Sequence, residues 1–244
     1  MPQYDSGFFE VNRDRAHGSA SVIVPIVLEF LQPRTVIDVG CGLGSWLVVF
    51  RDHGVEDLFG VDGTWVRQED LEIPREKFLA WDLTKPLFLK RQFDLVVSLE
   101  VGEHLPPESA EVFVDTLTQL GKVVLFSAAI PFQGGTHHVN EQWPDYWAKL
   151  FRARSFEPVD CVRRRIWQDG SVETWYAQNI LLYSHRDILQ TNAILRSEWE
   201  RTSLAQLSIV HPRHYLGIAD PGRATISKLL QRFPAALGAI VRGR

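Results

Sequence analysis

The chain has 244 residues, of which 45% are hydrophobic and 23% charged, and its formal net charge is −4. This length suits one sizeable domain with a short appendage, and the acidic balance excludes a general basic field that would attract nucleic acid. Two cysteines, an N-terminus without a signal-peptide pattern and the lack of an apolar run of about 18 residues favour a cytoplasmic protein with no membrane span.

Predicted strands and helices alternate over most of the chain. A helix is expected at 19–31, strands at 35–40, 58–62, 77–81, 94–99 and 122–127, and further helices at 44–53, 108–120 and 143–154. This alternation predicts an α/β fold with a parallel sheet and helices on both faces. Two more β-like stretches, 159–167 and 174–183, flank Gln168-Asp169-Gly170, a plausible hairpin turn.

The pattern changes from His185 onward. Residues 187–204 are expected to be helical and residues 209–220 irregular. The segment 221–244 has an apolar stripe and no acidic residue, and its basic residues are Arg223, Lys228, Arg232, Arg242 and Arg244. Two interpretations stay open: a C-terminal helix packed on the domain, or a basic amphipathic segment that contacts a membrane surface or a partner protein.

The most informative motif is Asp-x-Gly-x-Gly-x-Gly at the end of the first strand, formed by Asp38, Gly40, Gly42 and Gly44. Glycine allows positive φ and a close approach of the backbone to a ligand, and the following helix offers free N–H groups. Ser45 stands near the position where a dinucleotide fingerprint requires glycine or alanine, so a diphosphate is a less suitable ligand. The acid Asp38 instead suits a cationic or hydroxyl-bearing ligand.

This motif resembles motif I of the class I S-adenosylmethionine (SAM)-dependent methyltransferases. The family expects a ribose-binding acid after the second strand, which Asp62 supplies, and an acid near the adenine after the third, which Asp82 supplies. The resemblance covers about residues 15–185 and implies a Rossmann-like, seven-stranded, mostly parallel sheet with a closing antiparallel hairpin. It implies SAM as the cofactor, bound by Asp38, Gly40, Cys41, Gly42, Gly44, Asp62, Gly63, Asp82, Leu83, Leu99 and Glu100.

The same resemblance divides the chain into three parts. An N-terminal cap and first helix occupy residues 1–34, and the SAM-binding methyltransferase core occupies residues 35–185. A helical basic C-terminal extension occupies residues 186–244.

Two clusters of ligand-type residues are expected at the acceptor side, after the fourth and fifth strands. The first is Glu-x-x-Glu-His, formed by Glu100, Glu103 and His104, and the second is His137-His138 in a glycine-flanked loop. The candidate catalytic residues are therefore Glu103, His104, His137 and His138.

Three roles for these clusters stay open. Glu-x-x-Glu-His with a later histidine resembles metal-assisted methyltransferases that act on the 3′-terminal ribose of RNA, and its first part alone resembles the ubiquinone-pathway O-methyltransferases. The first resemblance implies Mg or Mn bound by Glu100, Glu103, His104 and His138. The alternatives are metal-free acid–base catalysis and substrate positioning only.

The leading functional prediction is methylation of a hydroxyl on a small molecule or glycan intermediate. The segment 136–147 resembles bacterial methyltransferases of surface-glycan or natural-product pathways, and Trp143, Tyr146 and Trp147 form either an aromatic substrate wall or part of the core. The alternatives are methylation of an amine or amide, possibly on a peptide, a nicotinamide-dependent oxidoreductase, and a SAM-fold binding protein without catalysis. RNA is disfavoured because no basic stripe accompanies the site.

Overall fold

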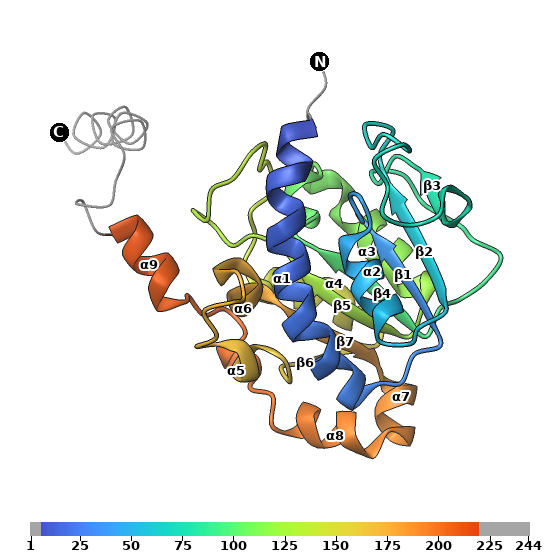
Figure 1. Cartoon of the computed structure of the whole chain (residues 1–244). Helices are drawn as coiled ribbons and strands as arrows, with labels where there is room; N and C mark the ends of the chain where they lie inside the picture. Colours follow the sequence, from blue (N-terminus) through green and yellow to red (C-terminus); the bar gives the residue numbers. More distant parts are fainter. Residues whose placement is uncertain (1–5, 220–244) are drawn as a thin grey trace. The chain divides into compact units, whose positions relative to one another are not determined.

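The computed structural model describes residues 6–219, with side chains from Arg13 onward. It divides into two units, Met1–Ile209 and Val210–Arg244, of which the first holds the sheet. The strands are β1 (Thr35–Val39), β2 (Asp57–Asp62), β3 (Phe78–Ala80), β4 (Leu95–Leu99), β5 (Val123–Ser127), β6 (Phe156–Val159) and β7 (Leu181–His185). They form one sheet in the order β3-β2-β1-β4-β5-β7-β6, in which β7 is antiparallel to both its neighbours and the other pairs are parallel (Figure 1). The prediction of a seven-stranded, mostly parallel sheet is confirmed.

Helices cover both faces of this sheet. The helices of the first unit are α1 (Ser6–Phe30), α2 (Ser45–Asp52), α3 (Ala110–Leu120), α4 (Pro144–Arg152), α5 (Arg163–Ile166), α6 (Thr174–Asn179), α7 (Arg186–Thr191) and α8 (Ala193–Glu200). One core cluster joins α1, α2, α5 and α6 to the sheet, and a second joins α3 and α4 to the opposite face. Successive strand residues alternate between the two, as Val96 and Val97 do on β4, because strand side chains point to opposite faces.

The closing antiparallel pair is present, but its position differs from the prediction. The strands predicted at 159–167 and 174–183 coincide with the sheet only at Val159 and at residues 181–183. Residues 163–166 and 174–179 are helical, and Gln168-Asp169-Gly170 is not a hairpin turn. Tertiary contacts override the local β propensity here. The fully buried Arg163 side chain bonds Asp160 and the backbone carbonyls of Gln178 and Leu207, which holds α5 in place.

Helix boundaries also differ at both ends of the chain. The first helix begins at Ser6 rather than residue 19, and the predicted helix at 187–204 breaks at Asn192, whose side chain caps α8. In the second unit, residues predicted to be irregular form α9 (Pro212–Ala219), where the His211 ring accepts a hydrogen bond from the Arg213 N–H. The basic segment 221–244 lies outside the described residues.

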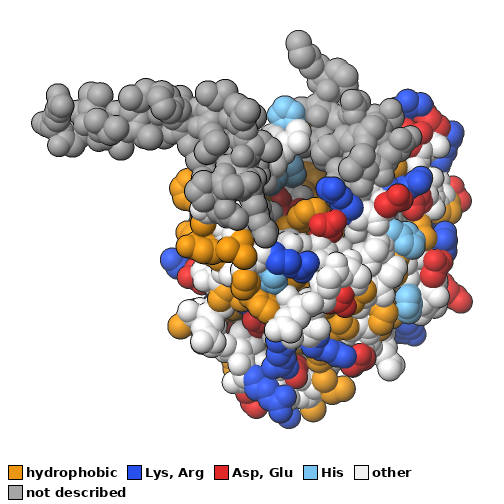
Figure 2. All heavy atoms as spheres, turned by 60° about the vertical axis from the view of Figure 1, so that its left-hand side comes forward, with side chains coloured by type: hydrophobic (Ala, Val, Ile, Leu, Met, Phe, Trp, Pro, Cys, Tyr) orange, Lys and Arg blue, Asp and Glu red, His pale blue; other side chains and the backbone are white. Residues whose placement is uncertain are grey.

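The described surface carries both signs of charge. On the face drawn in Figure 2, basic and acidic side chains are intermixed around apolar ones. Several form ion pairs, such as Arg165 with Glu29 at 2.7 Å and Arg186 with Glu157 at 2.6 Å. Within residues 6–219, none of the helices combines the length and apolarity that a membrane span requires.

The aromatic core beneath α4 yields a stability prediction. Phe151 is fully buried, stacks on Tyr183 at 3.9 Å between ring centroids and meets Phe126 edge-on at 5.4 Å. Phe151→Ala is expected to lower the free energy of unfolding by about 3–5 kcal/mol, because the cavity removes these contacts. Urea unfolding measures this, with Phe88→Ala as the matched control. Phe88 is 74% exposed, so its loss should cost no more than about 0.5 kcal/mol.

Candidate active site

The glycine-rich turn connects β1 to α2 and closes tightly over the ends of the strands. Gly40, Gly42 and Gly44 have φ values of 90°, 54° and 95°, which favour glycine. The N–H of Gly40 donates to the Val61 carbonyl at 2.7 Å, and a Cβ on Gly40 would lie 2.3 Å from Val101 Cγ2. A side chain at position 40 therefore could not be accommodated without moving the end of β4.

Asp62 links this turn to the end of β2. Its carboxylate accepts hydrogen bonds from the N–H groups of Gly42 at 2.7 Å and Gly63 at 2.6 Å. Burial raises the pKa of Asp62, and these bonds together with one from the Trp65 side chain oppose that shift. The Trp65 ring lies over Gly63, where an added Cβ would stand 2.3 Å from it. An acid and an aromatic face thus lie together at the end of β2.

Two more groups near the turn are buried. Asp38 on β1 is 2% exposed, and its pKa is raised well above its usual value by desolvation first and by the Asp62 carboxylate second. Desolvation and the same two acids raise the pKa of the Cys41 thiol. A thiol that stays protonated in a buried turn is a packing group rather than a nucleophile.

The predicted acid after β3 has a different setting. The Asp82 side chain is half exposed, accepts hydrogen bonds from the Thr84 N–H and hydroxyl, and pairs with Lys85 at 3.3 Å. The Thr84 hydroxyl is the main cause of its lowered pKa. Asp82 therefore holds its own turn together, while the neighbouring predicted residue Leu83 is buried, as is Leu99 at the end of β4.

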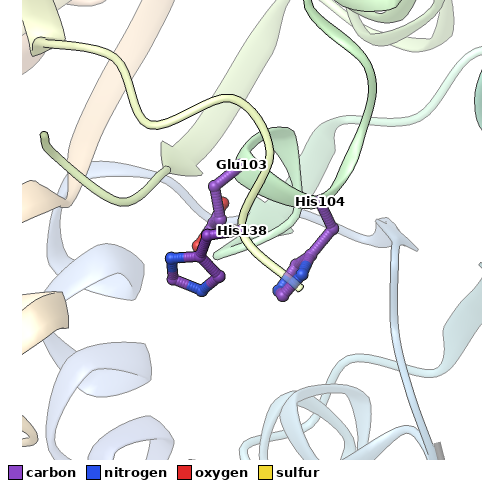
Figure 3. Close-up of side chains that lie close together, drawn as sticks. All are labelled: Glu103, His104 and His138. Atoms are coloured by element: carbon purple, nitrogen blue, oxygen red, sulfur yellow. The ribbon is translucent and has the colours of Figure 1, made fainter. Parts of the chain in front are cut away.

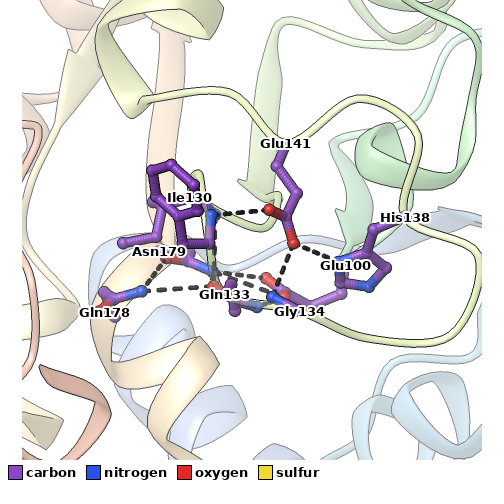
Figure 4. A network of polar contacts seen from close by, with 9 residues as sticks. Glu100, Ile130, Gln133, Gly134, His138, Glu141, Gln178 and Asn179 are labelled. Atoms are coloured by element: carbon purple, nitrogen blue, oxygen red, sulfur yellow. Dashed lines mark hydrogen bonds and ion pairs between the residues drawn. The ribbon is translucent and has the colours of Figure 1, made fainter. Parts of the chain in front are cut away.

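Glu100 follows β4 in a left-handed conformation, with φ 55°. Its carboxylate accepts hydrogen bonds from Gln133 Nε2 at 2.9 Å and Asn179 Nδ2 at 3.1 Å (Figure 4). Burial raises its pKa, and the Asn179 bond is the largest opposing contribution. Gln133, Asn179 and the adjacent Gln178 were not predicted from the sequence as site residues. In the sequence they appear only as amide side chains in segments predicted to be a loop and a hairpin, which does not distinguish them from other polar residues.

Glu103, His104 and His138 form one compact cluster (Figure 3). One potential ligand atom from each lies within 4.8 Å of the others, and the two imidazole centroids are 4.9 Å apart. Glu103 and His104 belong to a 3-10 turn, Gly102–His104, that follows β4. The Glu103 carbonyl accepts hydrogen bonds from the Val139 and Asn140 N–H groups at 2.8 and 3.0 Å, which holds the histidine loop against this turn.

The Glu103 side chain is buried with little compensation, since only the backbone of Glu103 and Ala129 opposes the rise in its pKa. It is fully inaccessible, and neither carboxylate oxygen has a hydrogen-bond partner among the described residues. Desolvation, and then the Glu100 carboxylate, raise its pKa well above the usual value. Burial and the nearby His138 lower the pKa of His104 to about 4. His104 is therefore neutral at physiological pH, with a lone pair available on one ring nitrogen.

A carboxylate and two imidazoles that converge in this way can hold a divalent metal ion or move a proton. The Glu103 carboxylate lacks a partner, and this fits a cation. The structure brings together three of the four predicted metal ligands. The fourth, Glu100, is a close electrostatic neighbour of Glu103 and is bonded to Gln133 and Asn179.

Other predicted residues lie apart from this cluster. His137 is exposed and has φ 59°. Its backbone, not its side chain, forms a hydrogen bond with the His104 ring. Trp147 is 2% exposed and packs on Phe126, so it belongs to the core, whereas Trp143 is 40% exposed. Among the three aromatic residues of this segment, Trp143 is the most open to a substrate.

Comparisons with known proteins show the family and the fold of the chain. The model of a methyltransferase domain family matches residues 11–156, which is more than half of the chain. No curated protein matches the chain.

Several solved structures share the fold. Magnesium protoporphyrin IX methyltransferase from Synechocystis PCC 6803, with bound SAH, is 21% identical over 72% of this chain and 87% of its own, with a TM-score of 0.52. SAM-bound CalS10, an amino pentose methyltransferase from Micromonospora echinaspora, is 14% identical over 75% of this chain and 98% of its own, with a TM-score of 0.56. DesVI from Streptomyces venezuelae is 15% identical over 73% of this chain and 96% of its own, with a TM-score of 0.54.

The buried Glu103 carboxyl leads to a pH-dependent stability prediction. A carboxyl whose pKa is raised by folding contributes stability that is complete below its unfolded pKa and is lost as the pH rises through the folded pKa. In chelator-treated protein, Glu103→Gln should therefore stabilise the fold at pH 8 by about 1–3 kcal/mol and by much less at pH 5. Urea unfolding at both pH values measures this. An equal effect at both would contradict the prediction, and Glu108→Gln, at an exposed position, is the control.

Proposed function

Because the chain belongs to the class I SAM-dependent methyltransferases, we propose that it transfers the methyl group of SAM to a hydroxyl of a small molecule or glycan intermediate. The cluster of Glu103, His104 and His138 after β4 is the observation that carries this proposal. In open α/β sheets, ligands bind beyond the carboxyl ends of the strands, so this cluster stands where an acceptor would lie.

The cofactor side of the proposed site is the glycine turn with Asp62. Asp62 holds the turn through two backbone N–H groups, and its remaining lone pairs can accept hydrogen bonds from ribose hydroxyls. Trp65 covers Gly63 and offers its ring to the adenine. Asp38 is buried in β1 beside Asp62, and an acid there suits the positively charged sulfonium of SAM.

The acceptor side must orient a hydroxyl and remove its proton. The hydroxyl oxygen attacks the methyl carbon as the carbon–sulfur bond breaks, S-adenosylhomocysteine leaves, and the hydroxyl proton passes to a base. His104 is neutral because its pKa is about 4, and it offers a lone pair. His138 presents a second imidazole 4.9 Å away. Either ring has a nitrogen that can receive the proton, but the lowered pKa makes His104 a weaker base than an ordinary imidazole.

The same residues fit a divalent ion, such as Mg or Mn. Glu103, His104 and His138 would hold it, with Glu100 as their neighbour. Such an ion supplies a Lewis acid that lowers the pKa of a hydroxyl bound to it. The unpartnered Glu103 carboxylate supports this version, because a buried carboxylate is stable only with a cation, a hydrogen-bond donor or a proton.

We also propose a cytoplasmic location. Cys41 and Cys161 are both unpaired and buried, which suits a reducing compartment. Contact of the basic segment 221–244 with a membrane surface or partner protein stays a prediction from sequence.

The first functional prediction concerns cofactor affinity. Asp62→Asn replaces one acceptor oxygen with an NH2 group, so the side chain can no longer accept bonds from both Gly42 and Gly63. SAM affinity is expected to fall about tenfold or more, equivalent to about 1.4 kcal/mol. Calorimetric titration of SAM measures the change. Asp52→Asn, an exposed position at the end of α2, should leave affinity unchanged.

The second functional prediction concerns metal. Titration of manganese into chelator-treated protein should give saturable binding that weakens at least about tenfold in Glu103→Gln and stays unchanged in Glu108→Gln. Chelation should likewise reduce methylation of a panel of hydroxyl acceptors. Saturable binding that survives Glu103→Gln would place the metal elsewhere. Methylation that is insensitive to chelator would leave His104 and His138 as metal-free proton acceptors.

A further inference from the structure

The Glu141 side chain bonds three groups of the loop between β5 and α4. Its Oε1 accepts a hydrogen bond from the Gly134 N–H at 2.7 Å and lies 2.9 Å from His138 Nδ1, and its Oε2 accepts from the Phe132 N–H at 2.8 Å (Figure 4). Three groups of one loop thus converge on one carboxylate. The course of the loop and the orientation of the His138 imidazole therefore depend on the same residue.

The loop needs such an anchor because its backbone is strained. Phe132 and His137 have φ values of 68° and 59°, and Gly134 has 71°. For the two residues with side chains, the left-handed region costs energy that surrounding contacts must offset. The N–H groups of Phe132 and Gly134 donate to Glu141, so the carboxylate bonds two of the three left-handed residues directly.

The contact with His138 also fixes the position of a proton. Both Glu141 oxygens accept hydrogen bonds from backbone N–H groups, so the side chain acts as an acceptor and Nδ1, which faces Oε1, carries the hydrogen. In the neutral ring, Nε2 then keeps its lone pair. A carboxylate that orients a histidine through one nitrogen while the other acts on a ligand is a common arrangement in metal and acid–base sites.

A second feature sets the position of the ring, because Nε2 is the imidazole atom that lies closest to Gly135. A Cβ on Gly135 would lie 2.2 Å from His138 Nε2, so any side chain at position 135 would collide with the ring. Gly135 is not among the glycines with positive φ, so its backbone does not itself require glycine. The requirement comes from the close approach to the imidazole.

We propose that Glu141 and Gly135 are positioning residues for His138. Glu141 selects the Nδ1–H tautomer, and Gly135 lets the ring pack closely on the loop backbone. His138 then offers Nε2, the nitrogen with the lone pair, to the acceptor hydroxyl or metal that it shares with Glu103 and His104. The role in catalysis rests on the proposed function. The tautomer can be measured without any knowledge of the acceptor.

Long-range proton–nitrogen NMR of the imidazoles at pH 8, where an ordinary imidazole is neutral, tests the proposal directly. The His138 signals, assigned with His138→Gln, should report Nδ1–H in the unmodified chain. In Glu141→Gln a single amide oxygen faces three donors, so His138 should shift toward Nε2–H, while Glu108→Gln should leave it unchanged. Nε2–H in the unmodified chain, or no change in Glu141→Gln, would overturn the proposal.

Activity separates positioning from folding. Glu141→Gln should lower kcat about 10–100-fold, with SAM affinity within about twofold. Gly135→Ala should also lower kcat but keep the Nδ1–H tautomer, because it moves the ring without removing the carboxylate. If both variants keep full activity while the tautomer changes as expected, the positioning role is wrong. If the unmodified chain binds no SAM, the proposed function fails and the tautomer assignment still stands.

Discussion

Four desolvated carboxyl groups crowd one edge of the sheet, and the design of the site follows from the need to stabilise them. Asp38, Asp62, Glu100 and Glu103 lie at or beyond the carboxyl ends of β1, β2 and β4, and desolvation is the largest cause of the raised pKa in each. Parallel strands necessarily bring their carboxyl ends to the same edge. At the opposite end of β2, Asp57 is paired with Arg91 and its pKa is lowered. These four acids thus lie where a ligand can approach, whereas the buried acids elsewhere, Glu157 and Glu198, are paired with arginines.

The chain does not stabilise these four groups equally. Those with several hydrogen bonds have a structural role, whereas one without such bonds is suited to bind a ligand. Asp62 and Glu100 each receive several hydrogen bonds from the protein, so they are fixed in place before any ligand arrives. Glu103 receives none among the described residues. A buried acceptor without a donor costs about 1–3 kcal/mol. This cost is consistent with a group that awaits a cation, a hydroxyl or a proton from outside the chain.

Local signals in the sequence predicted most of the sheet and part of the site. The parallel strands are short apolar runs bounded by turn residues, and the glycine turn needs positive φ. Both features depend on residues that are close in the sequence, so both can be predicted from it. The final antiparallel pair was misplaced because α5 depends on Arg163, whose partners include the carbonyl of Leu207, 44 residues away. Gln133 and Asn179 were missed for the same reason. They meet Glu100 across 33 and 79 residues, and amides carry no periodic pattern.

Strained backbone conformations are concentrated near these buried acidic residues. Among the described residues, four with side chains have positive φ, and three of them, Glu100, Phe132 and His137, belong to the acceptor side of the site. Neither the strain nor the buried Glu103 stabilises the fold, so the two large apolar clusters on either face must offset both. A ligand that satisfies Glu103 and fastens the histidine loop would recover part of this cost on binding. The strained loop and the buried Glu103 lower the stability of the free protein. Binding that relieves them can therefore help to hold the acceptor in its reactive position.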